Sequence, residues 1–151
     1  MKRWRKICCG IDFSEPSRIA MLQAAELARD SGGELLLVHA YAKAHATLLA
    51  TDLIAPADAE AMEELVQELE RKLGGWRDEA ARIRGGPVDA RVVIGDPASE
   101  LLALARAEQA DLLVVSTHGR TGIARAVLGS VAERVAREAH CSVLVARRPA
   151  A

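Results

Sequence analysis

The chain has 151 residues, 50% of them hydrophobic and only 3% aromatic, which suits one domain with a core of Leu, Val, Ile and Ala. The 20 Lys and Arg residues and 21 Asp and Glu residues leave a formal net charge of −1, which argues against binding nucleic acid or an anionic membrane through overall charge. No apolar run approaches the roughly 20 residues of a membrane-spanning helix. The apolar stretch after the basic start breaks at Gly10 and Asp12, so we also expect no secretory signal.

The first half of the chain predicts two strands and two helices. Residues 6–11 and the continuous apolar run 34–40 are expected to be buried strands. Between them, residues 16–30 are expected to form a helix. It is capped by Ser14, has Pro16 in its first turn, and is stopped by the glycines at 32 and 33.

Residues 41–59 show no firm periodicity and are interpreted as a mobile loop. A long helix follows over about residues 57–84. Its apolar stripe is expected to pack in the core and comprises Met62, Leu65, Val66, Leu69 and Leu73.

The second half continues the alternation. Residues 88–94 predict a strand that alternates Val88, Ala90, Val92 and Ile94, and Asp96 is expected to cap a helix that begins at Pro97. A uniformly apolar strand at 112–116, a short helix at 131–139 and a last strand at 142–146 complete the pattern.

This order predicts an α/β fold in a single domain spanning residues 1–151. Its core is a doubly wound, open, parallel, five-stranded sheet with helices on both faces, a Rossmann-like arrangement. Right-handed crossovers place the loops after Ile11, Ala40, Ile94 and Ser116 on one edge of the sheet. Ligands of such sheets bind at that edge, so these loops are the candidate site.

The three cysteines are interpreted as small buried residues in a reducing cytoplasm, since their odd number argues against a disulfide framework. Cys8 and Cys9 are adjacent in a strand and point to opposite faces, and the four histidines show no metal-ligand spacing. We therefore expect no protein-held metal and a cytoplasmic location.

The loop after the fourth strand, residues 116–130, has the composition of a phosphate site. Glycines let backbone N–H groups approach an anion, and the following helix start adds free N–H groups and a positive dipole end. Arginine side chains in the same loop add positive charge, and histidine and serine side chains add hydrogen-bond donors. The residues concerned are Gly119, Gly122, Gly129, Arg120, Arg125, His118 and Ser130. A structural alternative exists for Ser130, which with Glu133 matches a capping box that would use the same N–H groups.

Asp12 follows the first strand at the same edge. Its carboxylate could accept hydrogen bonds from a ribose hydroxyl or an adenine amino group. The alternative is a turn or cap residue ahead of the helix that Ser14 begins.

These segments resemble the universal stress proteins over nearly the whole chain. The family signature is G-x-x-G, nine residues, then G and S or T. Here Gly119 is the second glycine, Gly129-Ser130 close the motif, and Ser116 holds the position of the first glycine. The stretches ICCGIDFSEPS, LLLVHAYA and VVIGDPASEL resemble the family's first three strands and their loops.

The resemblance implies an ATP site, with or without Mg²⁺. It assigns Ile11, Asp12 and Ala40 to adenine and ribose, and Ser116 to ribose. It assigns the phosphate contacts to Gly119, Gly129, Ser130 and Val131, with His118 and Arg120 nearby. It also implies a homodimer that pairs its last strands, Ser142–Ala146, antiparallel, and a regulatory stress-response protein rather than an efficient enzyme.

Two alternatives within the same family stay open. One is a nucleotide-free interaction dimer. The other is a slow ATP hydrolase that would have to use Asp12, Glu133 and His118. Other classes lack their motifs. A receiver domain would need clustered acids and a lysine after the last strand, a Rossmann dehydrogenase G-x-G-x-x-G after the first strand, and a P-loop enzyme G-x-x-x-x-G-K-[ST].

Overall fold

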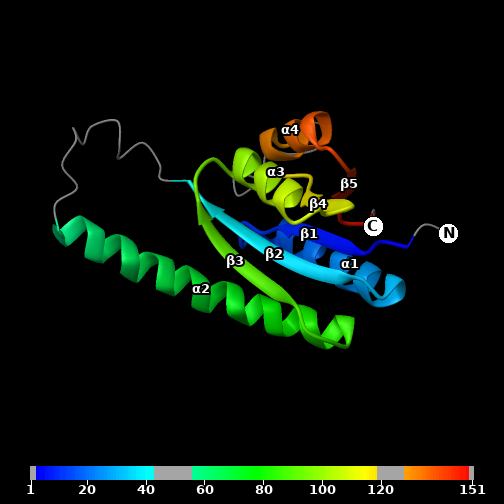
Figure 1. Cartoon of the computed structure of the whole chain (residues 1–151), viewed down its shortest axis with the longest axis horizontal. Helices are drawn as coiled ribbons and strands as arrows, with labels where there is room; N and C mark the ends of the chain where they lie inside the picture. The colour runs from blue at the N-terminus through cyan, green and yellow to red at the C-terminus, as the bar shows by residue number, and fades with distance from the viewer. Residues whose placement is uncertain (1–2, 43–55, 119–127, 150–151) are drawn as a thin grey trace.

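The structure, a computed structural model, describes residues 3–42, 56–118 and 128–149. Strands and helices alternate along these residues (Figure 1). In chain order they are β1 (Lys6–Gly10), α1 (Glu15–Ser31), β2 (Glu34–Tyr41), α2 (Pro56–Arg84), β3 (Asp89–Ile94), α3 (Pro97–Ala107), β4 (Leu112–Ser116), α4 (Ser130–Glu138) and β5 (Ser142–Ala146). The predicted order of elements is confirmed.

The five strands form one parallel sheet, as predicted, and their order in it is β3-β2-β1-β4-β5. Ile7 of the central strand β1 pairs with Leu35 on one side and Leu112 on the other. The chain moves outward from β1 to β3 and then returns to add β4 and β5 on the opposite side. The strand order therefore reverses between β1 and β4, which is where open sheets of this type bind ligands.

Helices cover both faces of the sheet, α1 and α2 on one side and α3 and α4 on the other (Figure 1). Side chains alternate between the two layers because successive strand residues point in opposite directions. Ile7 and Cys9 pack among the residues of α1 and α2, whereas Cys8 packs among those of α3 and α4. This double burial explains why the inner strands read as continuous apolar runs.

The helix ends follow the predicted chemistry. The Ser14 side chain accepts the amide of Ser17 at the start of α1, and the Asp96 carboxylate accepts the amide of Ser99 at 2.9 Å at the start of α3. The hydrogen bonds from Ser99 lower the pKa of the Asp96 carboxyl. Gly32 ends α1 with a φ of 67°, the left-handed region that glycine enters without a steric penalty.

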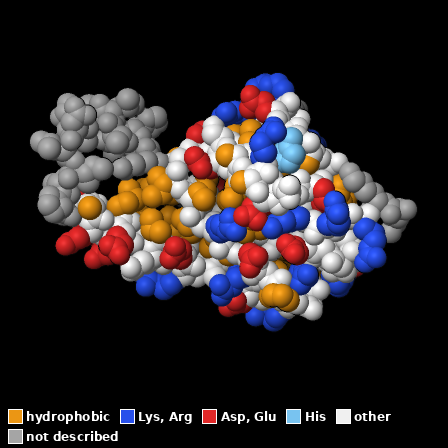
Figure 2. Space-filling view, in the orientation of Figure 1, with side chains coloured by type: hydrophobic (Ala, Val, Ile, Leu, Met, Phe, Trp, Pro, Cys, Tyr) orange, Lys and Arg blue, Asp and Glu red, His pale blue; other side chains and the backbone are white. Residues whose placement is uncertain are grey.

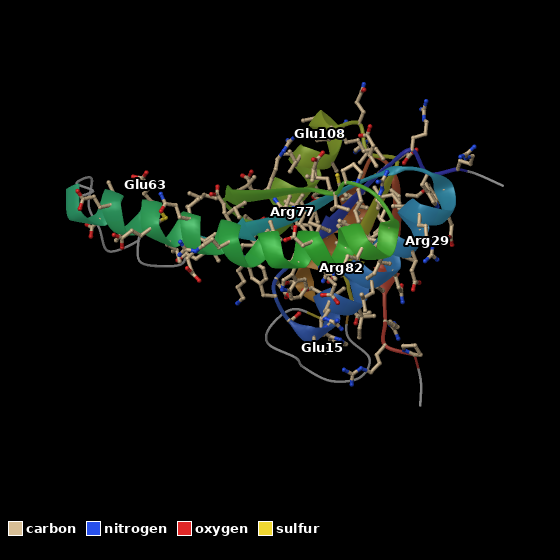
Figure 3. All side chains as sticks on the ribbon, turned by 90° about the horizontal axis from the view of Figure 1, so that it is seen from below. Glu15, Arg29, Glu63, Arg77, Arg82 and Glu108 are labelled. Carbon is tan, nitrogen blue, oxygen red and sulfur yellow. The ribbon has the colours of Figure 1, made fainter. Side chains whose placement is uncertain are left out.

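Helix α2 differs from its prediction in what it buries. Of its apolar stripe only Leu73 is fully buried, and the four residues before it are half-buried. The reason is the length of the helix, whose first half extends past the sheet, where Glu63 lies, while Arg82 lies along the packed half (Figures 1 and 3). None of the described helices combines the length and apolar character needed to cross a membrane.

The segment predicted as a mobile loop, residues 41–59, is shorter than expected at both ends. Tyr41 belongs to β2 and residues 56–59 belong to α2. Residues 43–55 lie outside the described part of the chain.

Two further side chains differ from expectation. Ile94, predicted as one of the alternating apolar residues of its strand, is 45% exposed at the end of the edge strand β3. Cys141 is half-buried, whereas Cys8 and Cys9 are fully buried as predicted. Burial raises the pKa of the Cys8 thiol to about 12.

Two glycines offer a matched test of the packing. At Gly33, between α1 and β2, a Cβ would overlap the backbone carbonyl oxygen of Trp4, whereas at Gly75 on the exposed side of α2 it would meet nothing. We expect Gly33→Ala to lower the free energy of unfolding by about 1–3 kcal/mol through overpacking. Gly75→Ala should raise it by about 0.5–1 kcal/mol, since alanine favours a helix interior. Urea unfolding measures both. Equal effects of the two substitutions would contradict this packing.

Candidate functional site

A cavity of about 530 Å³ opens at the carboxyl edge of the sheet, beside the reversal point between β1 and β4. Its volume falls within the usual range of small-molecule sites, about 300–1,000 Å³. The lining residues come from β1, β2, β4 and three helices, and comprise Gly10, Ile11, Asp12, Val38, His39, Ala40, Tyr41, Ala42, Leu65, Leu69, Pro97, Leu101, Val115, Ser116, Gly129, Ser130, Val131 and Ala132. Figure 2 shows hydrophobic side chains gathered at this end of the molecule, next to α2.

Most of the predicted site residues meet at this cavity. Those that line it are Ile11, Asp12, Ala40, Ser116, Gly129, Ser130 and Val131. His118 is not among the lining residues, and Gly119 and Arg120 fall outside the described residues. Residues more than 100 positions apart thus converge on one space, as the predicted edge of the sheet requires.

Asp12 has the turn role that was the alternative for it, and it also lines the cavity. Its Oδ1 accepts the backbone N–H of Ser14 at 2.9 Å and also the Ser14 hydroxyl, an Asx-turn ahead of α1. The carboxylate also lines the cavity. Between these two residues Phe13 has a φ of 64°, which is unusual for a bulky side chain.

The start of α4 does not form the capping box that was the structural alternative for Ser130. The N-cap is Gly129, no side chain caps the helix, and Ser130 is the first helical residue. Glu133 instead extends along the exposed side of the helix to Arg137, with Oε1 3.4 Å from Nη1. The reason is that Gly129 donates its N–H to the carbonyl of Thr117 at 2.6 Å, which holds the end of β4 against the helix start and shifts the cap by one residue.

The missing cap leaves an electropositive helix end at the cavity. Among the described residues, the backbone N–H groups of Ser130, Val131 and Ala132 have no acceptor. All three residues line the cavity. Free N–H groups and the positive end of the helix dipole together favour an anion at this position.

Ser116, the last residue of β4, also lines this cavity. Its hydroxyl donates to the carbonyl oxygen of His118 at 3.0 Å, so the side chain folds back along its own turn. The Nδ1 of His118 and the hydroxyl oxygen of Thr117 are 3.0 Å apart, and His118 Nε2 is buried with no hydrogen-bond partner in the part of the chain described. The Ser116 hydroxyl is thus bound within the turn that follows β4.

Several lining residues were not predicted from the sequence. Leu65 and Leu69 were assigned to the core, and only the overhang of α2 brings them to the cavity. His39 was considered only as a metal ligand and rejected. The sequence places His39 directly before Ala40, a predicted site residue, and this neighbourhood could have indicated that His39 lies near the site. No group of three His, Cys, Asp or Glu residues in the described segments lies close enough to hold a metal ion.

Comparison with known proteins gives a consistent result. The model of the universal stress protein family matches residues 3–147. Universal stress protein MJ0531 of Methanocaldococcus jannaschii is 32% identical over 146 residues, which are 97% of this chain and 84% of that protein.

Two solved structures have the same fold. Hypothetical protein MJ0577 is 25% identical, with a TM-score of 0.84 over 99% of this chain and all of that one. A universal stress protein in complex with cAMP is 27% identical, with a TM-score of 0.65 over 97% of this chain and 99% of that one. The five-stranded parallel sheet, the match along nearly the whole chain and the relative at 32% identity together show that the chain belongs to the universal stress protein family.

Proposed function

We propose that the cavity binds ATP and that the protein acts as a nucleotide-binding regulator. The observation that carries the proposal is the uncapped start of α4, which faces the same cavity as Asp12. A carboxylate that can accept from a sugar or a base and a helix end that attracts phosphate are the two polar groups that a nucleotide requires.

The adenosine end of the ligand fits the β1 and β2 side of the cavity. Ile11, Val38 and Ala40 supply apolar surface there, and Leu65 and Leu69 of α2 add to it. Apolar surface of this kind suits a planar base, while Asp12 provides the acceptor for a ribose hydroxyl or the adenine amino group. In this arrangement Ser116, at the end of β4, lies beside the ribose.

The phosphate end fits the start of α4. The amides of Ser130 and Val131 supply donors, and the Ser130 hydroxyl can add another. A related protein of the family is known in complex with cAMP, which supports an adenine nucleotide as the ligand class. Gly119 and Arg120 of the family motif would complete the phosphate contacts.

We propose a binding role rather than efficient catalysis. Asp12 is the only acid among the described cavity-lining residues, and its Oδ1 already accepts from Ser14. Hydrolysis requires a positioned water and usually Mg²⁺ held by acids, so any Mg²⁺ would arrive with the phosphates. The buried thiols of Cys8 and Cys9 suit the reducing cytoplasm as the place of action.

We also propose that the protein is a homodimer through β5. In the described chain this strand pairs only with β4, so its outer edge has unpaired backbone groups. Val143, Leu144 and Val145 are each half-buried along it. An apolar edge of this kind promotes pairing with a second strand, and a second copy supplies one.

The first prediction concerns Asp12. Asp12→Ala should weaken ATP binding by about tenfold or more, the expected cost of losing a hydrogen bond to a charged group. Isothermal titration with ATP measures the change. The matched control is Asp89→Ala, which removes an exposed carboxylate at the amino end of β3, the opposite edge of the sheet, and should leave the affinity unchanged. Wild-type affinity in Asp12→Ala would place the ligand elsewhere.

A second prediction isolates one backbone amide. Gly129 has φ −59° and ψ 154°, the conformation preferred before proline, and the first helical position accepts proline readily. Ser130→Pro therefore removes the N–H and the hydroxyl without breaking α4, and Ser130→Ala removes the hydroxyl alone.

We expect Ser130→Ala to bind ATP within about threefold of wild type, and Ser130→Pro about tenfold or more weakly, because an amide-to-phosphate bond is charge-assisted. Adenosine, which lacks phosphates, should bind both variants equally. If Ser130→Pro retained the ATP affinity of Ser130→Ala, the α4 amides would not be the phosphate site.

A third prediction tests the dimer without a substitution. Sedimentation velocity should give a dimer. Amide hydrogen exchange over Ser142–Ala146 should accelerate on dilution below the dissociation constant, because outward N–H groups lose their partners. The other edge strand, Asp89–Ile94, is the internal control and should exchange at a rate independent of protein concentration. Concentration-independent exchange in both strands would rule out β5 as the interface.

A further inference from the structure

One turn of the site is held in a conformation that its sequence does not favour. Phe13 has a φ of 64°, in the left-handed region where a bulky residue is sterically strained. Such a conformation persists only where the surroundings impose it. The contacts of Phe13 with the rest of the protein therefore decide how Asp12, the residue before it, is presented.

The half-buried Phe13 ring packs against side chains of two elements, β2 and α2. Its centroid lies 4.5 Å from that of His39 on β2 and 5.6 Å from that of Trp76 on α2, the latter in an edge-on arrangement. The Nζ of Lys72 lies 4.6 Å from the same centroid, within the range of a cation–π contact. These contacts hold the ring in place, although the backbone that carries it is strained.

His39 also holds the residue on the other side of Asp12. Its Nδ1 lies 2.7 Å from the carbonyl oxygen of Ile11, and since a carbonyl can only accept, Nδ1 carries the proton. The N–H of Ile11 in turn donates to Val38 at 2.8 Å, so both backbone groups of Ile11 are bound to β2. His39 as a whole residue is only 8% exposed, which shields this hydrogen bond from water.

We infer that His39 is a positioning residue for the nucleotide, because one side chain bonds the residue before Asp12 and packs against the residue after it. It sets the direction of the Asp12 carboxylate into the cavity. The inference rests on the proposed nucleotide site, and it adds a residue that acts through Asp12. A histidine that only filled the core would stabilise the fold without any dependence on Asp12.

Three substitutions separate the two contacts of His39. His39→Asn keeps an N–H donor at the distance of Nδ1 from the main chain but lacks the ring. His39→Phe keeps a ring against Phe13 but has no donor. His140→Asn, at an exposed histidine between α4 and β5, is the control for the loss of a histidine as such. Melting temperatures without ATP are measured first, and His39→Met, apolar and without a donor, replaces His39→Phe if that variant does not fold.

The decisive measurement is a double-mutant cycle with Asp12→Ala, read as the ATP dissociation constant from titration calorimetry. In the wild-type background we expect His39→Phe to weaken ATP binding by about tenfold, as for the loss of one buried hydrogen bond. In the Asp12→Ala background it should cost nothing further. His39→Asn should recover most of the affinity, and His140→Asn should bind as wild type does.

The outcomes distinguish this inference from the proposed function. Three results in a wild-type protein that binds ATP would overturn the inference. His39→Phe could leave the ATP affinity unchanged, or lower it by the same factor with and without Asp12→Ala. Alternatively, His39→Asn could bind ATP no more tightly than His39→Phe. If the wild-type protein does not bind ATP at all, the proposed function fails and the inference fails with it.

Discussion

The parallel pairing of the five strands is the constraint on which the rest of this structure depends. In a parallel sheet every strand must be followed by a crossover, so all strand-to-helix turns leave from the same edge. Here the reversal between β1 and β4 separates two of those turns and leaves the cavity between them. Asp12 and the start of α4 are brought together by this topology, although more than 100 residues separate them.

In the same topology, the middle of each strand holds the core together, and the strand ends carry the polar groups. Their middle residues are apolar on both faces and hold the helices, as the alternation of Cys8 and Cys9 between the two layers illustrates. Polar contacts concentrate at the two edges. At the amino edge, Glu108 pairs with Lys6, their charged atoms 2.6 Å apart, and with Arg91 at 2.5 Å. At the carboxyl edge, donors and acceptors such as Asp12 and the α4 amides face an open space instead.

The fold was predictable because its signals are local. Apolar runs, Ser14 and Asp96 as caps, and Gly32 as a stop all act within a few residues of one another. Residues that end a strand or directly follow one, as Ser116 and Asp12 do, could be placed at the carboxyl edge of the sheet from the sequence. The sequence was less informative about residues whose positions depend on tertiary contacts. The capping box, the alternative considered for Ser130, does not form because Thr117, thirteen residues away, binds the Gly129 amide. His39 was missed because its role depends on the turn after a neighbouring strand, which periodicity along its own strand does not reveal.

The strained turn at Phe13 also bears on the speed of association. Because the Phe13 ring packs against His39 and Trp76, contacts within the protein itself fix the conformation of the turn around Asp12. The conformational entropy of that turn is therefore lost during folding and does not have to be lost again when a ligand enters. A binding surface prepared in this way favours capture of a ligand at the first encounter over binding that waits for a slow rearrangement.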